Sequence, residues 1–186
     1  MASVRYDRYG NPAGTRMASR LWRERRGVTA VEFGLIAMPL MGLMIATLQI
    51  ATTMFTQQVL ETTAEKAGRL LLTGRAQNAR MSQSQFKSAV CGTLAAYMKC
   101  DNLLIDVQTV DDFSSAVTTL PTITYGQDGK PNNKTAYSAG NPGDIVVLRV
   151  MYVWGVQGGP LGFDISNLTS NRRMLMATSV FRSENY

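Results

Sequence analysis

The sequence predicts an α+β fold in which a long N-terminal helix packs on a small antiparallel β-sheet, with a second, shorter helix between them in the chain. Residues 33–60 contain no charged side chain. An apolar stripe then continues at helical spacing through Leu60, Ala64, Ala67 and Leu71. From Leu103 the apolar period changes to two, which is typical of strands. Helices followed by strands favour an α+β domain.

The apolar run is long enough to cross a membrane, because a helix needs only ~20 apolar residues to span the hydrocarbon core. We expect one helix from about residue 31 to residue 73, with Gly74 as its candidate C-cap. Residues 28–58 are its predicted transmembrane part, and residues 59–186 form the predicted head domain.

Several residues within the predicted span are candidates for helix packing in lipid. Gly42 and Ala46 are small residues four positions apart, a spacing that lets two helices approach closely. Pro39 removes one backbone donor and is expected to bend the helix. Phe33 and Gly34 complete the set. Membrane helices are also richer in Gly and Pro than soluble ones, so the spacing is compatible with packing without establishing it.

The positive charge is concentrated before the span. The chain has a formal net charge of +6, and residues 1–27 hold seven Arg against two acids, which leaves +1 for residues 28–186. Arginine on one side of a membrane helix marks that side as cytoplasmic. A nucleic-acid-binding arm is the other interpretation of this cluster, but a membrane span follows it and no nucleic-acid-binding fold does. We therefore expect a membrane contact and no nucleic-acid partner.

Two cysteines, Cys91 and Cys100, lie on the opposite side of the span from the arginines, where a periplasm would favour a disulfide. A second helix is predicted over residues 84–98. Nine helical residues would separate the two Cα atoms by ~13 Å, whereas a disulfide needs less than ~7 Å. A bridge therefore requires this helix to end early. A zinc or redox pair is the competing interpretation, but further ligands and a C-x-x-C spacing are missing.

The strands are expected at residues 103–109, 145–154 and 173–181, with short ones at 123–125 and 135–137. Residues 103–109 alternate apolar and polar side chains and predict a half-buried strand. Residues 145–154 are apolar on nearly both faces, which suits a central strand. The sequence has no His, and no nucleophile, base or metal-ligand set has recognisable spacing. We predict no enzymatic activity, no cofactor and no metal.

The sequence contains, in this order, a basic cluster, Gly27, four further residues, Glu32 and a long apolar helix. This arrangement resembles the processing site of a type IV prepilin. The stretch from Gly27 to Leu35, followed by Pro39 and Leu40, is similar to the TadE-like pilins of tight-adherence (Tad) pili. The resemblance rests mainly on residues 26 to about 74. An acid at the edge of a membrane helix is in any case a functional candidate.

The resemblance implies a minor pilin or pseudopilin involved in Tad pilus assembly or initiation. Residues 1–27 would be a cytoplasmic leader, which a prepilin peptidase removes by cutting between Gly27 and Val28. Glu32 would then set the register between subunits. The implied partners are other pilin subunits, the peptidase and the pilus assembly platform. The implied location is the bacterial inner membrane with the head in the periplasm, and the cell surface once a pilus assembles.

Two alternatives keep the membrane orientation without the pilus. One is an uncleaved single-span protein that carries a periplasmic binding module. A secretory signal peptide is less suitable, because the apolar run is too long and lacks a small-residue cleavage site after it.

Within the pilin resemblance, a head of over 100 residues favours a minor or initiating subunit, since major Tad pilins are very short. Such a head could present an adhesive surface.

Overall fold

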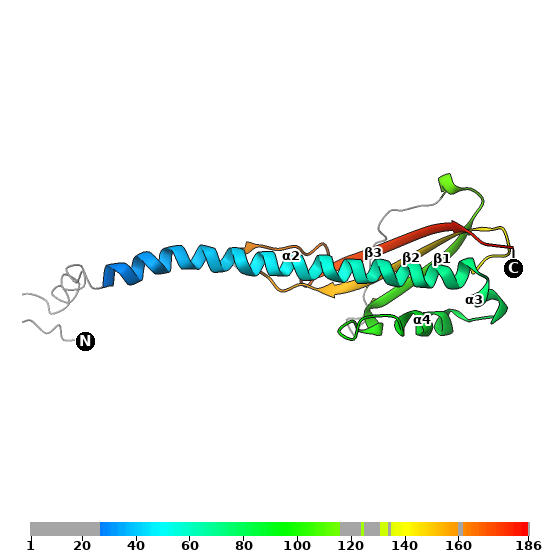
Figure 1. Ribbon diagram of the computed structural model, residues 1–186, viewed down its shortest axis with the longest axis horizontal. Coiled ribbons are helices and arrows are strands. Elements are labelled where there is room, and N and C mark those ends of the chain that lie inside the picture. The colour runs from blue at the N-terminus through cyan, green and yellow to red at the C-terminus, as the bar shows by residue number, and fades with distance from the viewer. Residues whose placement is uncertain (1–26, 116–123, 125–130, 134, 160–161, 186) are drawn as a thin grey trace, which may run out of the picture. The chain divides into compact units, whose positions relative to one another are not determined.

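A computed structural model describes residues 27–115, 124, 131–133, 135–159 and 162–185 (Figure 1). The chain divides into two units, residues 1–45 and 46–186. The helices are α2 (Val28–Leu72), α3 (Arg75–Asn78) and α4 (Gln83–Cys91), with short 3-10 turns η2 (Cys100–Asn102) and η3 (Phe113–Ser115). The strands are β1 (Leu103–Val110), β2 (Ile145–Gly155) and β3 (Arg172–Arg182). The α+β class is therefore confirmed. The predicted leader lies outside the described residues, except for Gly27.

Helix α2 continues without a break past Pro39, and it begins three residues before the predicted start. It ends where Gly74 takes a left-handed conformation with φ 69°. The N–H of Gly74 donates to the Leu71 carbonyl at 3.2 Å. Glycine adopts this conformation without the steric cost that a Cβ would add, which explains the helix end. The predicted cap is confirmed.

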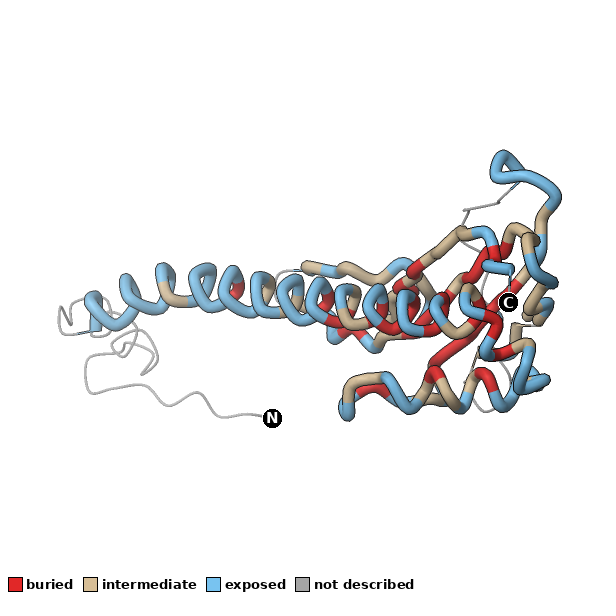
Figure 2. The backbone as a smooth tube through the Cα atoms, turned by 45° about the vertical axis from the view of Figure 1, so that its right-hand side comes forward, coloured by how far each residue is buried: buried red, intermediate tan, exposed pale blue. Residues whose placement is uncertain are grey.

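The sheet has the order β1-β2-β3 with both pairs antiparallel, so β2 is the central strand as predicted. The β2 residues Val146, Leu148 and Val150 are fully buried. The predicted stripe on α2 covers this face: Leu60, Ala64, Ala67 and Leu71 are all at most 3% exposed. Figure 2 shows the buried segments of α2 beside the buried strands.

One close approach between helix and sheet depends on a small residue. A Cβ added to Gly68 would lie 3.4 Å from a ring carbon of Phe181 and 3.9 Å from a methyl of Leu148. Larger side chains at this position would push α2 away from β2 and β3. The small residues of the head segment of α2 therefore set how closely the helix packs on the sheet.

The prediction of a half-buried first strand is wrong, because β1 is also buried on the face of the sheet opposite α2. Leu104 is buried in a second apolar cluster with Met151 and Met174. Asp106 is only 6% exposed, and its carboxylate accepts a hydrogen bond from Arg149 Nη1 at 3.1 Å. Leu168 and Met176 pack against the cluster, so residues far along the chain cover positions that period two assigns to solvent.

The segment after β1 is less regular than predicted. Tyr137 makes an isolated parallel bridge with Val107, so residues 135–137 do not form a strand. The predicted strand at 123–125 lies outside the described residues, apart from Thr124, which is not in a strand. The Tyr137 ring lies 5.5 Å from that of Phe86, and burial raises the pKa of its hydroxyl. This segment thus extends the cover of the β1 edge.

Candidate membrane and assembly site on the first helix

The first half of α2 carries large apolar side chains that the rest of the described chain does not cover. Val31, Phe33, Leu35 and Ile36 are each more than 60% exposed. Exposed large apolar residues then recur up to Phe55, which is 61% exposed. A helix that is apolar on all sides and uncovered is unfavourable in water, because burying apolar surface is the main driving force of folding. This surface therefore requires lipid or other chains around it.

Among the described helices, α2 alone is long and apolar enough to cross a membrane by length and composition. Its most apolar 18-residue window has a mean hydropathy of 1.9, and only 6% of that window is buried. A helix of the same composition in the core of a soluble protein would be mostly buried. One candidate membrane-spanning helix near the N-terminus is consistent with membrane anchoring.

The predicted processing residues lie at the beginning of this helix. Gly27 is exposed and directly precedes α2, and Val28 is the first residue of α2, 50% exposed. A Cβ added to Gly27 would have no atom within 4 Å. The fold of the described chain thus gives no steric reason for glycine here, so a requirement for it would have to come from another molecule.

Glu32 lies four residues after Val28, on the same face of the helix. Its side chain is exposed, and no described residue makes an ion pair or hydrogen bond with it. In lipid, a carboxylate without a partner would be costly. The arrangement leaves its oxygens available to a cation outside the described chain.

The predicted packing residues all lie in the first half of α2, before the stripe that packs on the sheet. Phe33 is 73% exposed, and a Cβ on Gly34 would meet no atom within 4 Å. Gly42 is buried and Ala46 is half-buried. The role of these residues in packing other helices stays a prediction.

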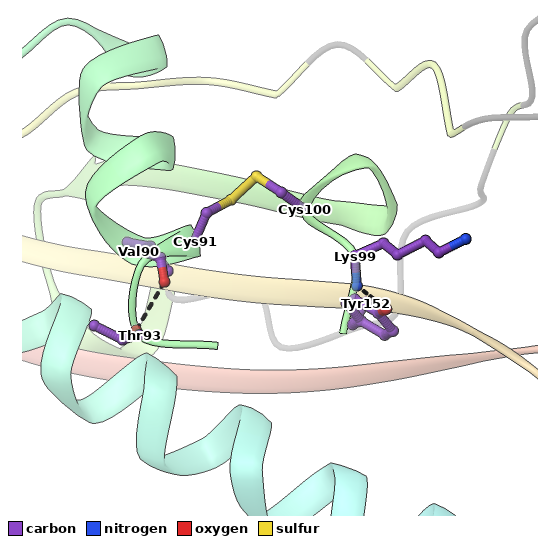
Figure 3. The surroundings of a disulfide bond; sticks show 6 residues. All are labelled: Val90, Cys91, Thr93, Lys99, Cys100 and Tyr152. Atoms are coloured by element: carbon purple, nitrogen blue, oxygen red, sulfur yellow. Dashed lines mark hydrogen bonds between the residues drawn. A yellow bond between two sulfur atoms is a disulfide. The ribbon is translucent and has the colours of Figure 1, made fainter. Parts of the chain in front are cut away.

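The two cysteines form a disulfide, as predicted (Figure 3). Cys91 is the last residue of α4, so the second helix ends seven residues before the predicted boundary. The Thr93 hydroxyl donates to the Val90 carbonyl at 2.7 Å and turns the chain. The backbone N–H of Lys99 then donates to the Tyr152 hydroxyl at 2.9 Å, which fixes the return segment on β2. The two Cα atoms are thereby brought to 5.5 Å.

Replacing both Cys91 and Cys100 by Ser is expected to lower the free energy of unfolding by ~2–3 kcal/mol, because a closed loop of this size restricts the unfolded chain. Denaturant titration of the detergent-solubilised full chain, followed by circular dichroism, measures this loss. Reducing the unsubstituted chain should produce the same loss. Equal stability with and without the bridge would contradict the expectation.

A groove of about 590 Å³ in the head unit was missed from the sequence. Its walls are apolar and aromatic, and its lining residues are Ala51, Thr52, Phe55, Thr56, Tyr97 and Trp154. Phe55, Tyr97 and Trp154 come from α2, the turn after α4 and β2. No local pattern relates residues so far apart in the chain, so only the fold identifies this group. Within the described residues no cluster of three or more Cys, Asp or Glu side chains has metal-binding geometry.

Comparison with known proteins agrees with the resemblance noted on the first helix. Residues 27–69 match the family described as TadE-like protein. The matched segment begins at the predicted processing glycine and ends within the part of α2 that packs on the sheet. The chain has no match among curated proteins or solved structures. Residues 27–69 are therefore a TadE-like segment, which indicates a protein associated with Tad pili.

Proposed function

We propose that this chain is a minor pilin or pseudopilin, a structural subunit that acts in the assembly or initiation of a Tad-type pilus. The observation that carries the proposal is the uncovered first half of α2. Its apolar side chains need a bilayer before assembly and neighbouring helices afterwards, and a pilin helix meets both in turn. The match over residues 27–69 covers this same segment.

The proposed sequence of events begins with insertion of α2 into the inner membrane, with the arginine-rich end on the cytoplasmic side. A prepilin peptidase then cuts between Gly27 and Val28. Gly27 would admit the peptidase because it carries no side chain, and the described chain itself does not require glycine there. The protein contributes the recognition segment and carries out no chemistry, and we propose that it is not an enzyme.

Cleavage would create an ammonium group at Val28. In the fibre, this cation would face the Glu32 carboxylate of a neighbouring subunit. Each charge would offset the desolvation of the other among apolar helices, which neither could do alone. The pair would then define the axial register of the subunits, while Gly34, Gly42 and Ala46 allow the helices to approach.

The head unit favours a minor role over that of the repeating shaft subunit. It contains a closed apolar core to which α2 contributes, and its three-stranded sheet and its disulfide both lie beyond the segment that matches the family. The second candidate function is an uncleaved, membrane-anchored periplasmic binding module. The open aromatic groove on the head favours it, since apolar grooves often bind ligands.

Replacing Gly27 by Leu is expected to block processing, because the new side chain would occupy the space that the peptidase needs. Gly34→Leu is the matched control, since a Cβ at either position meets no atom of the described chain. Gel mobility of both variants in cells with an active prepilin peptidase measures the effect. The proposal predicts a precursor for Gly27→Leu and mature chain for Gly34→Leu. Normal processing of Gly27→Leu would refute the requirement for glycine at the cleavage site, and a precursor for the unsubstituted chain would support the uncleaved anchor instead.

A further inference from the structure

Three aromatic side chains form an open cluster on the head unit. The Phe55 and Tyr97 rings lie 6.5 Å apart in a stacked arrangement, and Tyr97 meets Trp154 edge-on at 6.2 Å. Phe55 is 61% and Tyr97 47% exposed, so the apolar groove they line is open to its surroundings. Exposed aromatic clusters of this kind are unusual on a surface that faces only water.

The position of the groove relative to a bilayer can be estimated by counting residues along α2 from its start at Val28. The hydrocarbon core is ~30 Å thick and corresponds to about 20 helical residues, while the bilayer with its headgroups is ~40–45 Å, or about 30 residues. If the first headgroup layer begins near Val28, the hydrocarbon ends near Ala51 and the second headgroup layer extends to about Thr56. The next charged residue of α2, Glu61, falls outside the bilayer.

Exposure of the side chains agrees with this count. Large apolar side chains of α2 are exposed up to Phe55, and beyond it on this helix none is exposed. Elsewhere in the described chain only Tyr97 and Phe113 are exposed large apolar residues. Tyr97 thus continues the apolar surface of α2 onto the head at the level where that surface ends.

The residue types suit this layer. Trp and Tyr are enriched at membrane–water interfaces, because an apolar ring and a polar tip satisfy both sides at once. Lys99 is exposed two residues after Tyr97, and long cations can extend from such a position to the headgroups. Gln49 donates to the Gln157 carbonyl, so the segment after β2 lies at this same level.

We propose that the Phe55–Tyr97–Trp154 groove is a lipid-binding surface that seats the head on the periplasmic interface of the membrane, with phospholipid acyl chains in the groove. This inference rests on the proposed membrane-inserted subunit and adds a second contact with the bilayer. The contact would fix the depth of α2, and with it the position of Glu32 before assembly. Leaving the membrane for a fibre would then uncover the groove.

Tryptophan fluorescence tests this proposal directly, because the chain contains only Trp22 and Trp154. Trp22→Phe leaves Trp154 as the single emitter in the full chain and changes no described residue. The protein is reconstituted in phosphatidylcholine–phosphatidylglycerol vesicles. These vesicles contain lipids spin-labelled either on the headgroup or at the end of the acyl chain, and flotation measures insertion separately.

The proposal predicts a blue-shifted Trp154 emission and a larger loss of fluorescence with the headgroup label than with the chain-end label. Phe55→Ser and Tyr97→Ser in the Trp22→Phe background should reduce this loss while the protein still floats with the vesicles. Phe113→Ser, an exposed aromatic on the turn η3, is the matched control and should not reduce it.

Three results would overturn the proposal. A floating protein whose Trp154 is equally unquenched by both labels would refute the lipid contact and leave membrane anchoring intact. A blue-shifted emission that is insensitive to both labels would show that a protein segment fills the groove. A chain that does not float would refute the lipid contact together with membrane insertion, and thus the proposed function.

Discussion

Replacing Glu32 by Ala is expected to remove the protein from pilus fibres while leaving membrane insertion and leader cleavage unchanged. The substitution leaves the Val28 ammonium of a neighbouring subunit without a partner among apolar helices. Breaking a buried ion pair by removing one member costs ~3–5 kcal/mol, which lowers an equilibrium constant by a factor of at least ~100. Immunoblotting of sheared fibres against membrane fractions measures the loss.

A second substitution at Glu32 separates the charge of the side chain from its shape, and a substitution at Glu65 serves as the control. Glu32→Gln retains the shape without the charge and should fail like Glu32→Ala. Glu65→Ala is the matched control, because Glu65 is an exposed acid on the same helix within the head unit. It should enter fibres at the normal level. Normal incorporation of Glu32→Gln would show that no ion pair sets the register.

Replacing Phe86 by Ala is expected to lower the free energy of unfolding of the head by ~3–5 kcal/mol, because it leaves a cavity in the core. Phe86 is a fully buried residue of α4 and packs against Tyr137 at a ring distance of 5.5 Å. The matched control is Phe113→Ala, which removes an exposed ring and should change the free energy by less than ~0.5 kcal/mol.

Denaturant titration of the detergent-solubilised full chain measures both substitutions. Equal effects of the two changes would mean that Phe86 does not belong to the main core. A loss in Phe86→Ala alone would show that α4 is an integral part of the head. It would also give the reason to expect that the disulfide at the end of α4 stabilises the unit as a whole.

The long helix and the strands were predictable because their buried residues follow regular periods. The stripe from Leu60 to Leu71 recurs with the helical period, and every member is buried. The continuous apolar run of β2 marks a strand covered on both faces. Gly74 marks the end of α2 because left-handed backbone at this point favours glycine.

The errors arose where distant contacts decide the structure. The period of residues 84–98 would continue the second helix to Met98, but the disulfide and the hydrogen bond between Lys99 and Tyr152 turn the chain back after Cys91. Leu104 and Asp106 occupy positions that face solvent in a two-residue period. They are buried because Met174 and Arg149 from other strands contact them.

The candidate site divides in the same way. Gly27, Val28 and Glu32 could be identified from the sequence, since their significance lies in spacing along one helix. The structure adds that none of the three is used by the fold of the described chain. The aromatic groove could not be identified, because its members come from three elements that only tertiary packing brings together.

The intact mass of the chain recovered from sheared fibres tests the proposed function most directly. Removal of the leader and incorporation into a fibre predict a chain that begins at Val28 and is present only when a prepilin peptidase is active. A full-length chain starting at Met1 in the membrane, and absent from fibres made by cells with an active peptidase, would contradict the pilin assignment. It would leave a membrane-anchored head.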